Sequence, residues 1–138
     1  MNGREFLDSN ILVYAYDRSN VRKASRAQEL VRRAVAGEFV ASTQVLGEFA
    51  ATLLHKSSPA INSHAVAAIL DALEPIPLVP LDAGTIRLAL QAQGKYGVYF
   101  YDGLILAAAE RGGCTRIWSE DLNSGQKYFG VRVENPFV

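Results

Sequence analysis

The sequence predicts an α/β fold of three layers, in which helices cover both faces of a mainly parallel central sheet. Short strand-like runs alternate with helical runs along the chain, and strands that are separated by helices usually pair in parallel through crossover connections. No internal repeat, low-complexity tract or long linker divides the 138 residues, a length that suits one sizeable core. We therefore expect a single α/β/α sandwich domain over residues 1–138.

Short apolar runs predict the strands. The clearest ones cover residues 5–7, 39–41, 115–118 and 131–133. Residues 76–81 also alternate in polarity, but prolines stand at positions 75, 77 and 80. Because proline lacks the N–H that a sheet ladder needs, we expect this run at the edge of the sheet at best.

Apolar residues at helical spacing predict the helices. The pattern is clearest in residues 22–35, which Gly37 is expected to end. Ser42 or Thr43 can cap the next helix, and Asp82 can cap a later one. The expected helices cover residues 10–15, 22–35, 44–55, 63–73, 83–93 and 101–112. Breaks are expected at residues 57–59 and 94–97, and a polar turn at 119–127.

Composition indicates the cellular compartment. The longest uninterrupted apolar run near a helix, residues 104–109, is far too short to span a bilayer. Residues 1–5 lack a basic lead followed by a long apolar region, so no secretory signal is expected. The single cysteine, Cys114, excludes a disulfide within the chain. We therefore expect a cytoplasmic protein that does not bind membranes.

The net charge is zero, with 14 basic and 14 acidic residues. A protein that holds nucleic acid by bulk attraction is normally basic, so any such binding here must depend on a local patch or on metal ions. Arg18, Arg22, Arg26 and Arg33 lie on roughly one helical face and could contact phosphate. We favour the simpler interpretation of a solvated face, in which Glu29 pairs with neighbouring arginines.

Four acidic residues stand where a site is expected in a parallel sheet, beyond the carboxyl ends of the strands. Asp8 ends the first strand, and Asp121 follows the strand at 115–118. Asp102 opens a helix, and Glu48 lies in the second turn of another. These four acids come from four separate segments, and their positions at strand ends and near helix starts could bring them together at one end of the sheet.

The chemistry of hard metal ions gives a reason for such a gathering. Mg²⁺ and Mn²⁺ prefer oxygen ligands, lower the pKa of a bound water and neutralise charge on phosphoryl oxygens. Two carboxylates ~4 Å apart repel by about 4 kcal/mol at an effective dielectric constant of ~20. A fold that tolerates this repulsion usually has a cation to bind there.

Each acid also has a purely structural interpretation. Asp8 could be a turn residue, Asp102 a helix cap or dipole partner, and Asp121 a loop residue. Glu48 is harder to explain in this way because it lies too deep in its helix for a capping box. The joint placement of the four acids therefore carries the argument.

Four segments, in the right order, resemble the motifs of PIN domains. Their sequences are FLDSNILVYA from residue 6, QVLGEF from 44, YDGLILAAA from 101 and SEDL from 119. In that resemblance, an aspartate follows the first strand, a glutamate lies in a helix, and another aspartate begins an alanine-rich helix. The likeness extends over essentially the whole chain and is closest to the VapC-like toxins of bacterial toxin–antitoxin pairs.

The resemblance implies a ribonuclease that depends on Mg²⁺ or Mn²⁺, forms a homodimer and is inhibited by a cognate antitoxin protein. By position, the family's metal-binding and catalytic acids match four residues here: Asp8, Glu48, Asp102 and Asp121. Asn10 and Ser119 match polar positions that support the acids. Glu120 is an extra acid, and its substitution for Asp121 stays open.

Two rival functions each explain part of the sequence. A receiver-like signalling domain needs a paired acid near the first strand and a central aspartate after a strand, and no aspartate ends the run at 39–41. A PIN fold without activity, which binds RNA or a protein partner, is opposed only by the presence of all four acids.

The aromatic residues at 96 and 99–101 could stack on unpaired bases, or could be core or dimer contacts.

Overall fold

The computed structural model describes residues 3–57 and 59–138, in which pairs of helices separate the first four strands and the last three strands follow one another. The strands are β1 (Arg4–Leu7), β2 (Phe39–Ser42), β3 (Leu78–Val79), β4 (Cys114–Trp118), β5 (Lys127–Tyr128) and β6 (Val131–Glu134). The helices are α1 (Ser9–Ala15), α2 (Val21–Val35), α3 (Thr43–His55), α4 (Ser63–Ala72), α5 (Ala83–Tyr96) and α6 (Phe100–Arg111). Met1, Asn2 and Ser58, in the expected N-terminal segment and the expected break at 57–59, lie outside the described residues.

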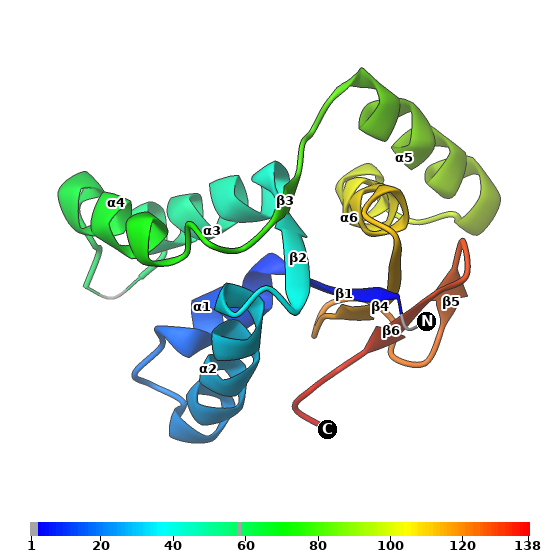
Figure 1. The fold of residues 1–138 in the computed structure, drawn as a ribbon. Coiled ribbons are helices and arrows are strands. Elements are labelled where there is room, and N and C mark those ends of the chain that lie inside the picture. Colours follow the sequence, from blue (N-terminus) through cyan, green and yellow to red (C-terminus); the bar gives the residue numbers. More distant parts are fainter. Residues whose placement is uncertain (1–2, 58) are drawn as a thin grey trace.

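The strands form one sheet in the order β3-β2-β1-β4-β6-β5. All neighbours pair in parallel except β5, which pairs antiparallel with β6. Helix α6 lies against one face, where it contacts β2, β3, β4 and β6, and α5 packs against α6 (Figure 1). Helix α2 covers the other face, and α3 contacts both α1 and β2. The predicted three-layer sandwich with a mainly parallel sheet is therefore confirmed.

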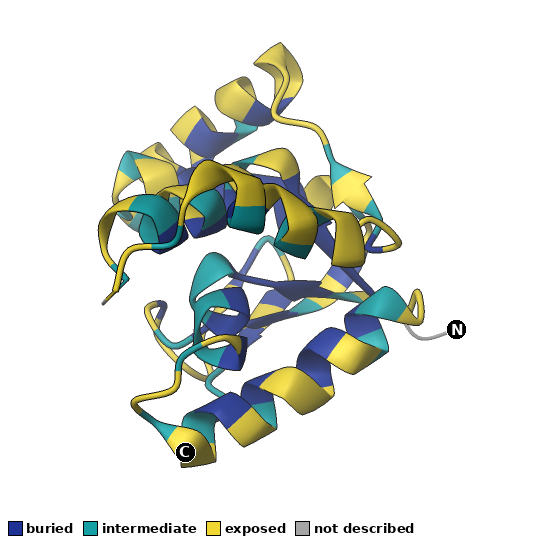
Figure 2. Cartoon of the chain, turned by 90° about the vertical axis from the view of Figure 1, so that its left-hand side faces the viewer, coloured by how far each residue is buried: buried dark blue, intermediate teal, exposed yellow. Residues whose placement is uncertain are grey.

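Burial explains why the central strands form where they do. Phe6 and Leu7 of β1 are fully buried, and every residue of β2 is buried, as expected for strands that helices cover on both faces. Helix α2 buries a single apolar stripe that includes Ala27 and Leu30, and Figure 2 shows buried and exposed residues alternating along the helices. No helix in the described part of the chain is long and apolar enough to cross a membrane.

A close helix contact fixes the start of α6. A Cβ atom on Gly103 would lie 2.9 Å from the carbonyl oxygen of Ala89 in α5. Only glycine allows this approach without displacing the backbone of α5. Residues 103–109 are all buried beneath α5 and against the sheet, so the position of Asp102 at the start of α6 is held by packing.

The expected end of the helix at 83–93 was wrong. Helix α5 continues to Tyr96, so the loop expected at 94–97 is largely helical. It ends at Gly97, whose φ of 68° suits a left-handed C-cap, whereas Gly94 is exposed and tolerated inside the helix.

The short strand β5 overlaps the polar turn expected at 119–127 and was not predicted. It reaches β6 through a two-residue turn in which Phe129 (φ 52°) and Gly130 (φ 78°) both have positive φ. Phenylalanine is an unusual residue for that position. It is held there by Tyr96, whose hydroxyl accepts a hydrogen bond from the Phe129 N–H at 2.8 Å.

Candidate active site

The predicted acids lie at the carboxyl end of the parallel strands. Asp8 directly follows β1, and its N–H donates a hydrogen bond to the Trp118 carbonyl at the end of β4, at 3.1 Å. Asp121 lies three residues beyond Trp118. Asp102 is in the first turn of α6, and Glu48 lies in the second turn of α3. We call Asp8, Glu48, Asp102 and Asp121 the acid cluster.

Asp8 is the most buried member of the acid cluster, with 6% of its surface exposed. Its carboxylate accepts hydrogen bonds from the Ser119 hydroxyl at 2.8 Å and the Ser9 N–H at 2.7 Å. Burial raises the pKa of Asp8 to about 6 although these two bonds lower it, and the charges of Glu48 and Asp121 raise it further. Asp8 thus sits within the electric field of two other members.

Glu48 and Asp102 complete the set of mutual repulsions. Burial raises the pKa of Glu48, contacts from Gln44 and Ser9 lower it, and the charges of Asp102 and Asp121 raise it. Burial also raises the pKa of Asp102, and the charge of Asp121 adds to that effect. Each of the four carboxylates therefore lies near enough to at least one other for their charges to interact, although no three among the described residues are close enough to share a metal ion.

The two supporting residues that the resemblance indicated lie between the acids. Asn10 donates through Nδ2 to Asp121 Oδ2 at 3.2 Å and to Ser119 Oγ at 3.4 Å. Ser119 is fully buried, and besides donating to Asp8 its hydroxyl accepts from the Asp121 N–H at 3.2 Å. Asn10 and Ser119 thus connect Asp8, at the end of β1, with Asp121, beyond the end of β4.

Glu120 does not point into the acid cluster. Its carboxylate accepts a hydrogen bond from the Tyr14 hydroxyl at 2.6 Å and forms an ion pair with Lys23. These contacts direct the side chain toward α1 and α2. The interpretation in which Glu120 replaces Asp121 therefore has no support from the side-chain geometry.

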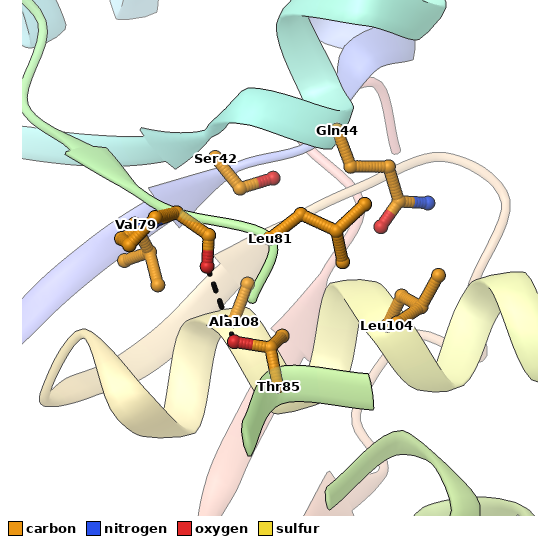
Figure 3. A pocket seen from close by; sticks show the side chains of 8 residues that line it. Ser42, Gln44, Val79, Leu81, Thr85, Leu104 and Ala108 are labelled. Atoms are coloured by element: carbon orange, nitrogen blue, oxygen red, sulfur yellow. Dashed lines mark hydrogen bonds between the residues drawn. The ribbon is translucent and has the colours of Figure 1, made fainter. Parts of the chain in front are cut away.

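Two residues beside the acids were not identified from the sequence. Ser9 donates to Asp8, as described above, and lies close to Glu48. Gln44, which lines a small pocket with Leu104 and other residues (Figure 3), donates through Nε2 to the Tyr101 carbonyl at 3.3 Å. Gln44 thereby connects α3 to the residue before Asp102. Its position four residues before Glu48 on one helix was the available signal.

The basic and aromatic residues near these segments have separate roles. Arg26 pairs with Glu29 at 3.4 Å, and Arg33 pairs with Glu38 at 3.4 Å, which agrees with the solvated-face interpretation. Tyr96 packs edge to face against Tyr128 and Phe129 and is a structural residue. By contrast, Tyr99 and Tyr101 are 68% and 54% exposed beside Asp102.

The donor chemistry of the acid cluster fits a hard divalent cation. Its four carboxylates form an all-oxygen set, which is what Mg²⁺ and Mn²⁺ prefer, and none of them forms an ion pair within residues 3–57 and 59–138. As they stand, no three acidic, histidine or cysteine side chains among the described residues are close enough to share a metal ion.

Known proteins provide an independent comparison. The model of the PIN domain family matches residues 6–128, whereas no curated protein matches the sequence. A toxin–antitoxin complex from Klebsiella pneumoniae has a chain of similar structure, with 16% identity, a TM-score of 0.68, and coverage of 96% of this chain and 97% of that one.

Two further solved structures have the same fold. FitAcB from Neisseria gonorrhoeae shares 17% identity at a TM-score of 0.65, covering 96% of this chain and 97% of that one. VapC20 from Mycobacterium tuberculosis, described as a Sarcin-Ricin loop cleaving toxin, shares 17% identity at a TM-score of 0.62, covering 85% and 89%. Identities this low show the fold alone, but the family match covers most of the chain. The chain therefore belongs to the PIN domain family.

Proposed function

We propose that this protein is an endoribonuclease that depends on a divalent metal ion, Mg²⁺ or Mn²⁺, and hydrolyses RNA phosphodiester bonds. One observation carries the proposal: four acids from four segments gather at the carboxyl end of the sheet without a cationic partner among the described residues. Membership of the PIN domain family supports it. The structural likeness to a toxin that is described as cleaving the Sarcin-Ricin loop agrees with RNA as the substrate.

In this proposal the acid cluster binds the metal and catalyses the hydrolysis. A divalent ion held there would lower the pKa of an attacking water and place positive charge beside the phosphoryl oxygens. Asn10 and Ser119 keep the carboxylates of Asp8 and Asp121 oriented through the hydrogen bonds described above. The exposed side of Asp121 leaves that end of the cluster accessible to a large substrate.

We further propose that the protein is the toxin of a toxin–antitoxin pair, with a cognate antitoxin as partner, and that it acts in the cytoplasm as a homodimer. Similar folds occur in solved toxin–antitoxin complexes, which supports the antitoxin. Support for a homodimer comes from exposed apolar side chains, since Ile86 and Leu90, four residues apart on α5, are 40% and 57% exposed.

A PIN-fold module that binds RNA or a protein partner without cleaving is the second candidate. The observation in its favour is that no three potential ligands among the described residues are close enough to share a metal ion as they stand. Both candidates predict binding, so cleavage and its dependence on metal distinguish them.

The decisive experiment is cleavage of mixed cellular RNA by the purified protein in Mn²⁺ and in EDTA. We expect cutting in Mn²⁺, none in EDTA, and a loss of at least about 100-fold in Asp8→Asn, since loss of an outer partner of a metal ligand alone costs about 10- to 100-fold. Glu110→Gln, an exposed acid on α6 outside the cluster, is the matched control and should cut normally. Cutting that persists in EDTA or in Asp8→Asn would contradict the proposal, and a folded protein that neither cuts RNA nor binds Mn²⁺ would identify the binding module.

A further inference from the structure

Glu120 occupies an unusual position, between Ser119 and Asp121 in sequence but directed away from both in space. Its two carboxylate oxygens have different partners: Oε1 accepts from the Tyr14 hydroxyl at 2.6 Å, and Oε2 pairs with Lys23 Nζ. Lys23 Nζ also donates to the Tyr14 hydroxyl at 3.3 Å. The three side chains therefore form a closed triangle that connects the segment after β4 to α1 and α2.

Two aromatic rings, those of Tyr14 itself and of Phe137, lie beside Lys23 in this triangle. Lys23 Nζ lies 4.7 Å from the centre of the Tyr14 ring and 5.3 Å from that of Phe137, and the two rings pack edge to face at 5.0 Å. The side chains of Lys23 and Glu120 are only 22% and 24% exposed. An ion pair that is partly removed from water and placed over aromatic rings is held more firmly than one on an open surface.

The triangle is joined to the acid cluster through Asn10. The Glu120 N–H donates to Asn10 Oδ1 at 3.2 Å, while Asn10 Nδ2 donates to Asp121 Oδ2 at 3.2 Å. Asn10 and Tyr14 are four residues apart on α1 and therefore lie on the same side of that helix. One face of α1 thus holds Glu120 by its backbone and by its side chain, and holds Asp121 by its carboxylate.

We propose that Glu120 is a positioning residue: with Lys23 and Tyr14 it fixes the segment after β4 against α1, and so holds Asp121 and Asn10 in the arrangement that binds the metal ion. This inference rests on the proposed function, because it concerns the affinity of the acid cluster for that ion. It assigns Glu120 no contact with the metal or with RNA. It also assigns Lys23 to holding the protein's own carboxylate and not a substrate phosphate.

The test measures Mn²⁺ affinity by calorimetry in the purified full chain, beside the melting temperature of each variant. Glu120→Ala and Lys23→Met should each weaken Mn²⁺ binding by about ten-fold, the lower end of the range for partners that orient a ligand. The double variant should be no weaker than either single one, because the two side chains act as a unit. Glu29→Gln, which breaks an exposed ion pair of α2, should bind Mn²⁺ like the wild type.

Each other result overturns the inference in a recognisable way. Weakening by Glu120→Ala but not by Lys23→Met would show that the ion pair with Lys23 does not hold Glu120 in place, and would overturn the triangle as the positioning unit. Lower melting temperatures with unchanged Mn²⁺ affinity would make the triangle a purely structural contact. If Glu120→Ala does not fold, Glu120→Gln and Tyr14→Phe, which remove only the charge or the hydroxyl, replace it. Failure of the wild type to bind Mn²⁺ would overturn the proposed function and this inference with it, whereas equal binding by all variants would overturn the inference alone.

Discussion

Two charged regions of the molecule differ in how their acids are neutralised. In the first, which we call the arginine network, Glu5 pairs with Arg116 at 3.0 Å and with Arg33 at 3.6 Å, and Arg116 also pairs with Glu134 at 3.4 Å. The second region is the acid cluster, whose members form no ion pair in the part of the chain that the structure describes. Only the first region supplies its own counter-charges.

This difference distinguishes charged residues that keep the protein soluble from charged residues that indicate a functional site. Half-buried acids whose arginine partners are partly exposed, such as Glu5 and Glu134, contribute solubility and little stability. A buried acid without a cation weakens the metal-free fold, so its presence is better explained by an external cation. Glu120 and Asp121 show the same contrast between neighbours in sequence. Glu120 pairs with Lys23, whereas the Asp121 carboxylate accepts a hydrogen bond from Asn10 and forms no ion pair among the residues that the structure describes.

The largest expected effect is a dependence of metal-free stability on pH. Burial raises the pKa of Asp8 from 3.8 to about 6, so between these values the folded protein keeps a proton that the unfolded chain has released. The contribution of Asp8 to the free energy of unfolding should therefore fall by about 3 kcal/mol as pH rises from about 4 to about 6, and then stay constant. Urea unfolding in EDTA across this range measures it.

Asp8→Asn is the control that isolates this effect from the titration of other acids. Asp82, whose pKa is lowered to about 2 by its bonds to Thr85 and Arg111, adds stability as pH rises, but mainly below pH 4. The variant lacks the titrating group and should become more stable than the wild type above pH 6. The difference between the two proteins should shrink toward pH 4. Parallel stability curves for the two proteins would show that the Asp8 carboxyl is not strained by burial.

A slightly smaller effect is expected from the metal itself. A cation that binds only the folded state at 100 times its dissociation constant stabilises it by about 2.7 kcal/mol, which for a domain of this size raises the melting temperature by roughly 10 °C. Mn²⁺ should produce this shift in the wild type and far less of it in Asp8→Asn. Thermal scans with KCl at matched ionic strength control for screening. A shift of the same size in both proteins would place the bound Mn²⁺ elsewhere.

Local patterns in the sequence predicted the positions of these acids better than they predicted the side-chain contacts around them. Asp8 follows an apolar strand and Asp102 begins an apolar helix, and strand order alone brings such positions to one edge. The direction of Glu120 could not be predicted, because it depends on Lys23, a contact between residues 97 apart in sequence. Likewise, the turn at Phe129 depends on the Tyr96 hydroxyl, and no local preference of phenylalanine would indicate it.

The smallest effect is expected in the arginine network. Arg116→Gln removes the guanidinium that joins Glu5 to Glu134, but the Arg116 side chain is 40% exposed and Glu5 keeps Arg33 as a partner. Exposed pairs contribute about 0.2–1 kcal/mol and are screened by salt, so urea unfolding should show a loss within that range that shrinks in 1 M NaCl. Mn²⁺ affinity should not change. A larger or salt-independent loss would mean that the arginine network, like the acid cluster, contains charge that solvent does not screen, and the distinction between the two regions would fail.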